Sequence, residues 1–137
     1  MHILEYLPSS LEVVQRFVPA VIDKLKDCGL TKEELFDVKL SLDEALVNAI
    51  KHGNKSNPEL KVSVNIEVKD GMLTMEVADQ GDGFDFTKIP NPTEKNNLHK
   101  NSGRGVFLIK KLMDRVEHFD CGRKIKMVKF LKIGGKK

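Results

Sequence analysis

The start of the chain shows the hydrophobic pattern of a strand followed by a helix. Residues 2–7 form a short apolar segment that suits a β-strand. Ser9 then stands three residues before Glu12, which is the spacing of a capping box at a helix N-terminus. Apolar residues recur beyond it at intervals of three and four. The pattern therefore predicts a first helix that has Ser9 as its N-cap and ends near Cys28 and Gly29.

A second, longer helix follows. Thr31 and Glu34 repeat the capping-box spacing, whereas Gly53 and Asn54 are residues of the kind that end a helix. The apolar positions between these ends share one helical face: Leu35, Val38, Leu42, Ala45, Leu46 and Ala49. We expect this face to pack on the core of the domain.

The period then changes from that of a helix to that of a strand. Apolar and polar residues alternate on both sides of an Asp70-Gly71 pair, which suits a two-residue turn. The alternating apolar positions are Val62, Val64, Ile66, Val68, Leu73, Met75 and Val77. This pattern predicts a β-hairpin with one buried face. The later segment at about 86–102 is polar, contains two prolines and shows neither period, so we predict that it forms a lid.

The helical period returns after this segment, and a second hairpin completes the pattern. A third helix is predicted over 106–116, directly after the run SGRG. Its inward positions would be Val106, Ile109, Leu112 and Val116. Residues 117–120 and 124–132 suit two strands joined by a turn at 121–122.

The last predicted strand is apolar on both sides. Ile125 and Met127 fall on one face. Val128 and Phe130 fall on the other, so we expect either a bulge or burial on both faces. The whole order, β-α-α-β-β-lid-α-β-β, predicts an α/β two-layer sandwich with a mixed β-sheet and helices on one face. We expect a single domain over 1–137.

Composition and charge agree with one globular domain. The 137 residues are 40% hydrophobic and 31% charged, and the net charge is only +3. No apolar run approaches the roughly 20 residues of a membrane span, and the first residues lack a signal-peptide pattern, so we expect a cytoplasmic protein. Cys28 and Cys121 belong to no metal or disulfide pattern. Lysines crowd the C-terminal segment without interleaved aromatic residues, which favours a solvated strand face over a nucleic-acid surface.

Polar side chains interrupt one face of the second helix. Ser41, Glu44 and Asn48 lie three or four residues apart. Either Lys51 or His52 continues the series. A solvent-facing edge would explain any one of these residues. On a packed helix they would need partners, so the stripe indicates either a wet face or a binding site.

A glycine-rich run, DQGDGF at 79–84, follows the first predicted hairpin. Asp79 ends the strand, and Gly81 and Gly83 come shortly after it. A carboxylate can accept a hydrogen bond from an exocyclic amine, and glycines let a backbone approach a flat ring closely. An ordinary turn would also explain the run. A calcium loop fits less well, because glycines occupy positions where such a loop needs oxygen ligands.

Gly103, Arg104 and Gly105 precede the third predicted helix. The free N–H groups and the positive dipole end of a helix N-terminus attract anions, so phosphate would suit this position. A plain loop before a helix would explain these residues more simply. The spacing is not that of a Walker loop, and the glycines do not follow a strand as a dinucleotide fingerprint requires.

Together, the three polar segments resemble the motifs of the GHKL ATP-binding superfamily, which includes gyrase-type ATPases, histidine kinases and anti-sigma-factor serine kinases. Its N box is similar to DEALVNAIKHGN at 43–54. Its first and second glycine boxes are similar to VADQGDGFD at 77–85 and SGRGVFLIKKLMDRVE at 102–117. The resemblance covers nearly the whole chain and implies the histidine-kinase-like ATPase fold. The histidine after NAI, the short glycine boxes and the small size are most similar to the anti-sigma-factor serine kinases.

The resemblance implies roles for these residues in binding ATP and Mg²⁺. Asn48 would bind Mg²⁺ through its amide oxygen, and Glu44 would be the catalytic base for an attacking hydroxyl. Asp79 would accept a hydrogen bond from the adenine amine. Arg104 would meet the γ-phosphate or face solvent, and His52 would orient or end the helix at the nucleotide site. The other nucleotide-binding residues implied are Gly81, Gly83, Phe84, Gly103, Gly105 and Val106.

One position departs from the family pattern. Related chains often carry a hydroxyl residue soon after the glycine that begins the last strand, where it supports the adenine-binding aspartate. This chain has GRKI at 122–125, with no serine or threonine. The departure implies a weaker hydrogen-bond network around the base and a lower nucleotide affinity.

The function implied by the resemblance is that of a cytoplasmic, ATP-dependent protein serine kinase that is also an anti-sigma factor. Such a protein would bind a sigma factor and phosphorylate a serine of an anti-sigma antagonist, without contacting nucleic acid or membrane, and it could form a homodimer. The alternative is a non-catalytic interaction module of the same fold that ATP only gates. A detached histidine-kinase domain and a nucleic-acid-binding module are less favoured alternatives.

Overall fold

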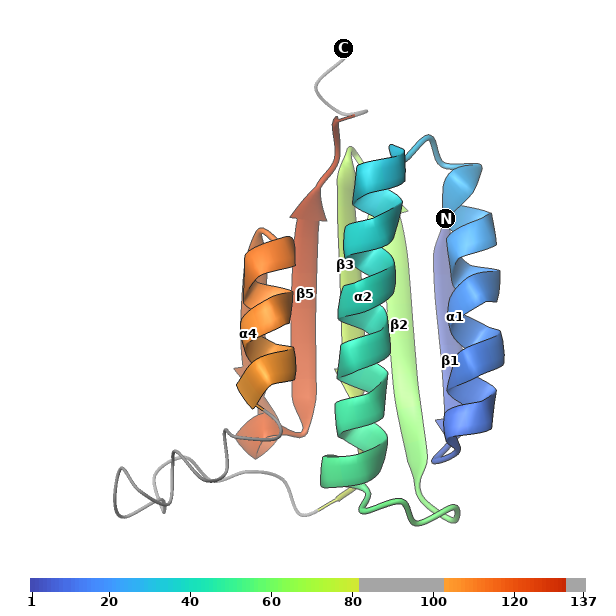
Figure 1. Ribbon diagram of the computed structural model, residues 1–137, viewed down its shortest axis with the longest axis vertical. Helices are drawn as coiled ribbons and strands as arrows, with labels where there is room; N and C mark the ends of the chain where they lie inside the picture. Colours follow the sequence, from blue (N-terminus) through green and yellow to red (C-terminus); the bar gives the residue numbers. More distant parts are fainter. Residues whose placement is uncertain (82–102, 133–137) are drawn as a thin grey trace.

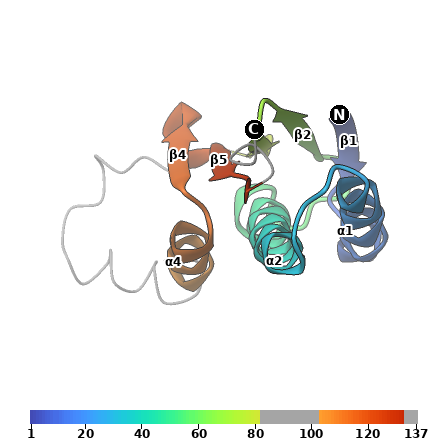
Figure 2. The same ribbon diagram turned by 90° about the horizontal axis from the view of Figure 1, so that it is seen from above.

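The computed structural model describes residues 1–81 and 103–132, in which helices cover one face of a five-stranded sheet (Figure 1). In chain order the elements are β1 (His2–Pro8), α1 (Leu11–Lys26), α2 (Lys32–Asn48), the π-helix η1 (Ala49–Gly53), β2 (Lys61–Lys69), β3 (Met72–Ala78), α4 (Gly103–Leu112), β4 (Arg115–Phe119), the 3₁₀ turn η3 (Asp120–Gly122) and β5 (Lys124–Phe130). Figure 2 shows the two layers, with α2 between α1 and α4.

The strands follow the order β1-β2-β3-β5-β4, and each neighbouring pair is antiparallel. The expected two-layer α/β sandwich is confirmed. One correction concerns the sheet, which was expected to be mixed but has no parallel pair among the described strands. The reason is the connection from β1 to β2. Two helices join these strands, so the chain returns to the end of the sheet that it left, and the next strand runs antiparallel.

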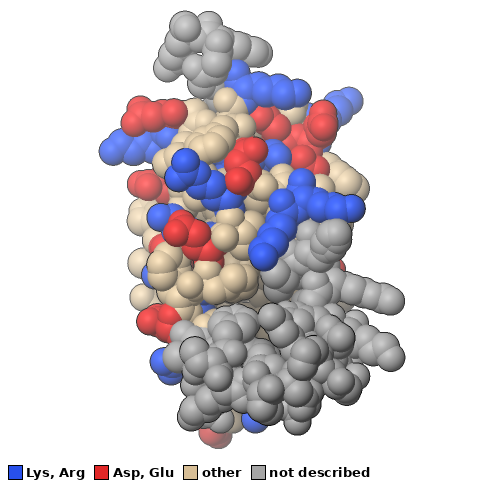
Figure 3. Space-filling model, turned by 90° about the vertical axis from the view of Figure 1, so that its left-hand side faces the viewer, with Lys and Arg blue, Asp and Glu red and all other residues tan. Residues whose placement is uncertain are grey.

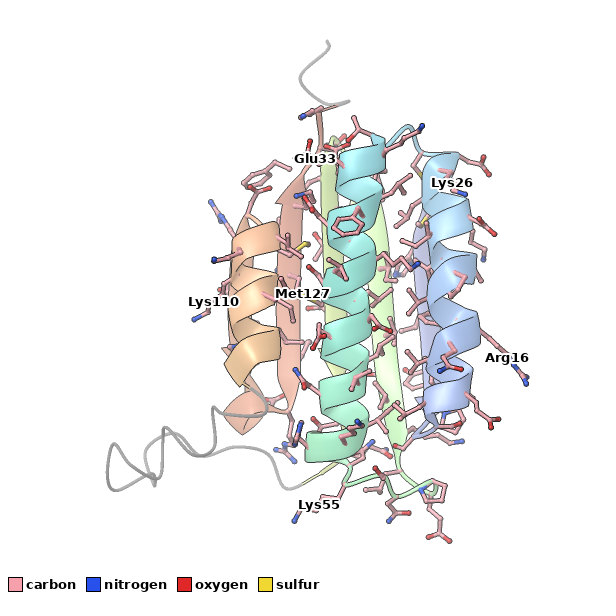
Figure 4. The ribbon with its side chains drawn as sticks, viewed as in Figure 1. Arg16, Lys26, Glu33, Lys55, Lys110 and Met127 are labelled. Carbon is pink, nitrogen blue, oxygen red and sulfur yellow. The ribbon has the colours of Figure 1, made fainter. Side chains whose placement is uncertain are left out.

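The core lies between the sheet and the helices. Strands β2 and β3 turn alternate apolar residues toward the helices, as the predicted hairpin requires. The largest fully buried side chains include Leu25, Leu42, Leu46, Ile50, Ile66, Leu73, Met75, Ile109 and Met127. Met127 of β5 points into the space between α2 and α4 (Figure 4). Because α2 is packed on both sides, its position on the sheet is fixed along its whole length.

A buried carboxylate joins the start of α2 to the end of β5. Thr31 Oγ1 accepts a hydrogen bond from the Glu34 N–H, and Glu34 Oε1 accepts one from the Thr31 N–H, which confirms the predicted capping box. Glu34 Oε2 accepts a hydrogen bond from the Lys132 N–H at 2.8 Å. Nearby, Lys129 pairs with Asp37 at 3.1 Å and donates to the last carbonyl of α4. These contacts hold α2, α4 and β5 together at one end of the sheet.

The N-terminus of α1 differs from the prediction. Ser10 occupies the N-cap position, and no side-chain hydrogen bond caps the helix there. Ser9 instead donates to the Leu60 carbonyl at 2.8 Å. The expectation that Ser9 caps α1 was therefore wrong, because a loop that is distant in the sequence engages its hydroxyl.

The helix α4 is shorter than predicted. It ends at Leu112, and Val116 lies in β4 rather than on a helix. The chain has already joined the sheet by Asp114, whose N–H donates to the Val128 carbonyl at 2.8 Å. In β5 the pairing with β3 is continuous, without a bulge. Met127 and Val128 are 0% and 5% exposed on opposite faces, which confirms burial on both faces.

The described surface carries mixed charges. Figure 3 shows acidic and basic side chains interspersed over one side of the molecule. Lys124 pairs with Glu76 at 3.4 Å, and Lys129 pairs with Asp37, so two of the C-terminal lysines form ion pairs. The Lys124 pair agrees with a solvated strand face, whereas Lys129 is largely buried against α2 and α4. No helix in the two described ranges is long and apolar enough to cross a membrane.

Replacing Glu34 by Gln tests the network at the start of α2. Burial alone would raise the pKa of Glu34, but hydrogen bonds from Thr31 and Lys132 lower it, with help from the Lys129 charge. A carboxyl group whose pKa is lower in the folded state stabilises the fold above its unfolded pKa. That stabilisation is lost as the pH falls through the folded pKa. We expect E34Q to lower the free energy of unfolding by about 1–2 kcal/mol at neutral pH and to have little effect in strong acid.

Urea unfolding at both pH values measures this difference. The control is E33Q, which makes the same change at the exposed neighbour Glu33 and should leave the free energy of unfolding unchanged. An equal loss for E34Q at neutral and acidic pH would contradict an electrostatic role for its carboxylate.

Candidate functional site

Three segments that stood out in the sequence meet at one end of the molecule. The end of α2 with η1, the end of β3 and the start of α4 all lie at the lower end in Figure 1. The capping network of Glu34 lies at the opposite end of α2. The fold therefore brings residues from three separate parts of the sequence to one edge of the helical layer.

The polar stripe of α2 runs toward this end. Glu44 and Asn48 are partly exposed, and His52 is exposed in η1. Within the described ranges, neither the Glu44 carboxylate nor the Asn48 amide forms a hydrogen bond or an ion pair. Ser41 is fully buried, and its hydroxyl has no partner among the described residues. The stripe is thus partly buried, and no described residue pairs with its carboxylate or its amide.

The π-helix η1 ends the stripe. Its wider turn is closed by the Asn54 N–H, which donates to the Ala49 carbonyl at 2.8 Å. Single π turns occur frequently at functional sites. The sequence carried no signal for this turn, although it correctly predicted that the helix ends at Gly53. The turn brings the Gly53 backbone against the end of β3.

Asp79 lies at the end of β3, partly buried against η1. Its Oδ1 accepts a hydrogen bond from the Gly81 N–H at 2.9 Å, and its own N–H donates to the Arg123 carbonyl at 2.9 Å. Burial raises the pKa of Asp79. The Gly81 N–H and the Arg123 charge offset only part of this rise. The carboxylate therefore becomes protonated at a higher pH than an exposed aspartate does.

Two glycines permit the close contact around Asp79. A Cβ built on Gly53 would overlap Asp79 Oδ2, and a Cβ on Gly81 would overlap the Gly53 carbonyl oxygen. A larger residue at either position would have to displace the carboxylate or the backbone. The structure places Gly81 beside Asp79. Gly53 has a second role, in this contact, that its position at a helix end did not reveal.

Asn54 is a buried residue whose role sequence reasoning missed. Its amide nitrogen donates to Ser9 Oγ at 2.9 Å and to the Lys61 carbonyl at 3.0 Å. Its Oδ1 accepts a hydrogen bond from the Gln80 N–H at 2.8 Å. The side chain thus joins η1 to the chain before α1, to β2 and to the segment after β3. A polar residue after Gly53 was the only sequence signal, and a helix end explains it equally well.

The helix α4 begins at Gly103, so the GRG run forms its first turn. The N-terminal backbone of α4 therefore lies at the same end of the molecule as Asn48 and Asp79 (Figure 1). The roles of Gly103, Arg104, Gly105 and Val106 stay predictions. The predicted Gly83, Phe84 and lid at about 86–102 lie outside the described residues.

Arg123 lies in the segment at 122–125, in which the resemblance led us to expect a hydroxyl residue and the chain has none. Its side chain is exposed, and its Nε donates to the Asp120 carbonyl at 3.2 Å. Its carbonyl accepts the hydrogen bond from the Asp79 N–H, and its charge acts to lower the pKa of Asp79. This chain therefore supports Asp79 by a backbone contact and a nearby cation.

The polar side chains described at this end suit Mg²⁺ that is bound together with a ligand. Among the described residues, no group of three or more His, Cys, Asp and Glu side chains could hold a metal. Asn48 offers one amide oxygen, a hard ligand of the kind that suits Mg²⁺. Mg²⁺ usually keeps several waters and binds substrate phosphates as well. The site therefore fits Mg²⁺ that arrives with a polyphosphate, and it does not fit a cage of protein ligands.

Comparison with known proteins places this geometry in a family. The family model described as the histidine kinase-like ATPase domain matches residues 4–129. The chain belongs to the histidine kinase-like ATPase family. The match runs from β1 to β5 and includes α2, the end of β3 and α4, so the site described above lies within this ATPase domain.

Relatives of this histidine kinase-like ATPase include proteins named serine-protein kinase RsbW. The protein from Staphylococcus epidermidis is 30% identical over 134 residues, which cover 92% of this chain and 84% of the relative. The proteins from Staphylococcus aureus strains MSSA476 and JH9 are each 29% identical, with the same coverage. The likeness therefore extends over most of both chains.

The pKa of Asp79 can be measured by NMR from the carboxyl carbon chemical shift during an acid titration. We expect a pKa above the ordinary value for aspartate, because burial outweighs the nearby N–H and charge. The variant R123A removes the cation and should raise the pKa further. R16A removes an exposed arginine of α1 (Figure 4) and should leave the pKa unchanged. A pKa at or below the ordinary value in the wild-type protein would contradict this assignment.

Proposed function

We propose that this histidine kinase-like ATPase is an ATP-dependent protein serine kinase that also acts as an anti-sigma factor. The observation that carries the proposal is a pair of groups, Glu44 and Asn48, that lack partners among the described residues. They lie one turn apart on α2, toward the same end of the molecule as Asp79. The printed name of the relatives, serine-protein kinase, supports the class of reaction. We further propose one domain over 1–137, a lid at about 86–102 and a cytoplasmic location.

In this proposal, Asp79 recognises the base of ATP. Its ionised carboxylate accepts a hydrogen bond from the exocyclic amine of adenine, and it retains lone pairs for this beyond the one that the Gly81 N–H uses. The contact of Gly53 with Asp79 fixes the direction of the carboxylate. Because the charged form is the stronger acceptor, we expect the affinity for ATP to fall as the pH is lowered through the pKa of Asp79.

In the same proposal, α2 and the start of α4 would hold the phosphates of ATP. The first N–H groups of α4 would hold them, and Arg104 would bind the γ-phosphate. Gly83, Phe84 and Val106 complete the nucleotide pocket, and His52 orients the end of the helix. The Asn48 amide oxygen would bind Mg²⁺, which would supply positive charge to the phosphates.

Glu44 is the proposed catalytic base. It accepts the proton of a serine hydroxyl on the protein substrate as the serine oxygen attacks the γ-phosphorus. A bond forms between the serine oxygen and the γ-phosphorus, and the bond from that phosphorus to the bridging oxygen breaks. ADP leaves with the electron pair of that bond. The proposed substrate is a serine of an anti-sigma antagonist, and the proposed second partner is a sigma factor.

Replacing Glu44 by Gln tests the catalytic role. Without a base, we expect phosphoryl transfer from ATP to a purified antagonist protein to slow by about 100- to 10,000-fold. Binding of ATP and of the sigma factor should stay near the wild-type level, because an amide of the same size replaces the carboxylate. Transfer of labelled γ-phosphate and calorimetric binding measure the two effects. The matched control is E33Q, at the other end of the same helix (Figure 4).

The results separate the two candidate functions. Transfer by E44Q at the wild-type rate would contradict the role of Glu44 as the base. A wild-type protein that binds ATP and the sigma factor but phosphorylates no antagonist would instead favour the non-catalytic, ATP-gated interaction module.

A homodimer is also proposed, through β1. This strand is an edge of the sheet, and Leu4 and Tyr6 are 51% and 65% exposed on it. Analytical ultracentrifugation of the wild-type protein should give twice the mass of one chain. The double variant L4E/Y6E should give a monomer, whereas F36E, at exposed Phe36 on α2, should not. A monomeric wild-type protein at micromolar concentration would count against this interface.

A further inference from the structure

We propose that Asn54 is a positioning residue that fixes Asp79 and thereby sets the preference of the site for adenine over guanine. The inference rests on the proposed function, in which Asp79 reads the base of a bound nucleotide. It concerns a residue that lies outside the glycine boxes and contacts neither the phosphates nor the base in that proposal.

The orientation of the Asn54 amide follows from its partners. The side chain is 1% exposed, so its polar atoms must be satisfied within the protein. Ser9 Oγ donates to the Leu60 carbonyl and therefore accepts from the Asn54 amide nitrogen, as does the Lys61 carbonyl. A flipped amide would place an oxygen against the Lys61 carbonyl. The amide oxygen must therefore face the Gln80 N–H, as the structure has it.

This amide oxygen completes the anchoring of three consecutive residues. The Asp79 N–H donates to the Arg123 carbonyl, the Gln80 N–H donates to Asn54 Oδ1, and the Gly81 N–H donates to Asp79 Oδ1. The Gln80 side chain is held as well, because its Oε1 accepts from the Lys61 N–H. Each backbone donor of the segment 79–81 thus has an assigned partner.

The packing around Asp79 leaves little freedom for its carboxylate. A Cβ on Gly81 would overlap the Gly53 carbonyl, and a Cβ on Gly53 would overlap the Asp79 side chain. Asp79 and Gln80 are adjacent, so a shift of Gln80 moves Asp79 as well. Gly53 blocks one side of the Asp79 carboxylate, so the carboxylate can move only away from Gly53. Asn54 follows Gly53 in the chain, and its side chain binds Gln80, so it holds η1 and the segment 79–81 in fixed positions relative to each other.

The chemistry of the bases explains why position affects selectivity. Adenine presents an amine donor at the position where guanine presents a carbonyl acceptor. A fixed carboxylate attracts the first and repels the second. If the Gln80 N–H loses its partner, the segment 79–81 can move the carboxylate aside, and the released N–H can donate to the guanine carbonyl. Both changes favour GTP relative to ATP.

The experiment compares the dissociation constants for Mg-ATP and Mg-GTP by calorimetry, together with thermal unfolding. We expect N54S, whose side chain is too short to reach Gln80, to reduce the ratio of GTP to ATP dissociation constants by about tenfold. N54A should do the same. The matched control is S9A, which removes a partner of the Asn54 amide nitrogen but keeps the Gln80 contact. It should lower the melting temperature and leave the ratio unchanged.

The outcomes distinguish the inference from the proposed function. A wild-type preference for ATP that N54S retains would overturn the role of Asn54 alone. An S9A variant with the same loss of preference as N54S would also overturn it, because general loosening would then explain both. A wild-type protein that binds ATP and GTP equally well, or binds neither, would overturn the reading of Asp79 itself.

Discussion

The contact between the end of α2 and the end of β3 sets the geometry on which the proposed site depends. Gly53 and Gly81 let two backbones approach closely, and the Asp79 carboxylate is confined between them. Asn54 holds the same two segments by hydrogen bonds from a buried position. A displacement here would change the distance from Asp79 to Asn48 and Glu44, since these lie on the helix that ends at this contact.

The opposite end of α2 is held by a different kind of interaction. The Glu34 carboxylate accepts hydrogen bonds from the start of its own helix and from the chain after β5, and Lys129 links α2 to α4. With both ends held and one face in the core, α2 can carry uncommitted polar groups on its remaining face. The apolar burial of Leu42 and Leu46 stabilises the helix, so its stability does not depend on Glu44 and Asn48, the residues proposed to bind the ligand.

Much of the fold could be predicted because it follows from local patterns. The alternation from Val62 to Val77 predicted the hairpin, and the spacing of Thr31 and Glu34 predicted the start of α2. The errors arose where a distant segment competed for a local group. Ser9 has the right spacing for a helix cap, but its hydroxyl donates to the Leu60 carbonyl instead. Val116 has helical spacing, but the backbone is already hydrogen-bonded to β5 at Asp114. The antiparallel pairing of β1 with β2 followed from the number of helices between them.

The sequence by itself determined which elements form and which polar residues stand apart from the hydrophobic pattern, because periodicity and capping act over a few residues. Tertiary structure alone decided that Gly53 touches Asp79, that Asn54 is buried with each amide group satisfied, and that Arg123 lies near the carboxylate. Apart from the Asn54 hydrogen bond to the Lys61 carbonyl, these contacts join residues separated by 26 or more positions in the chain, as between Asn54 and Gln80. No local sequence pattern predicts contacts between such distant residues, because these contacts depend on how the helices and the sheet pack.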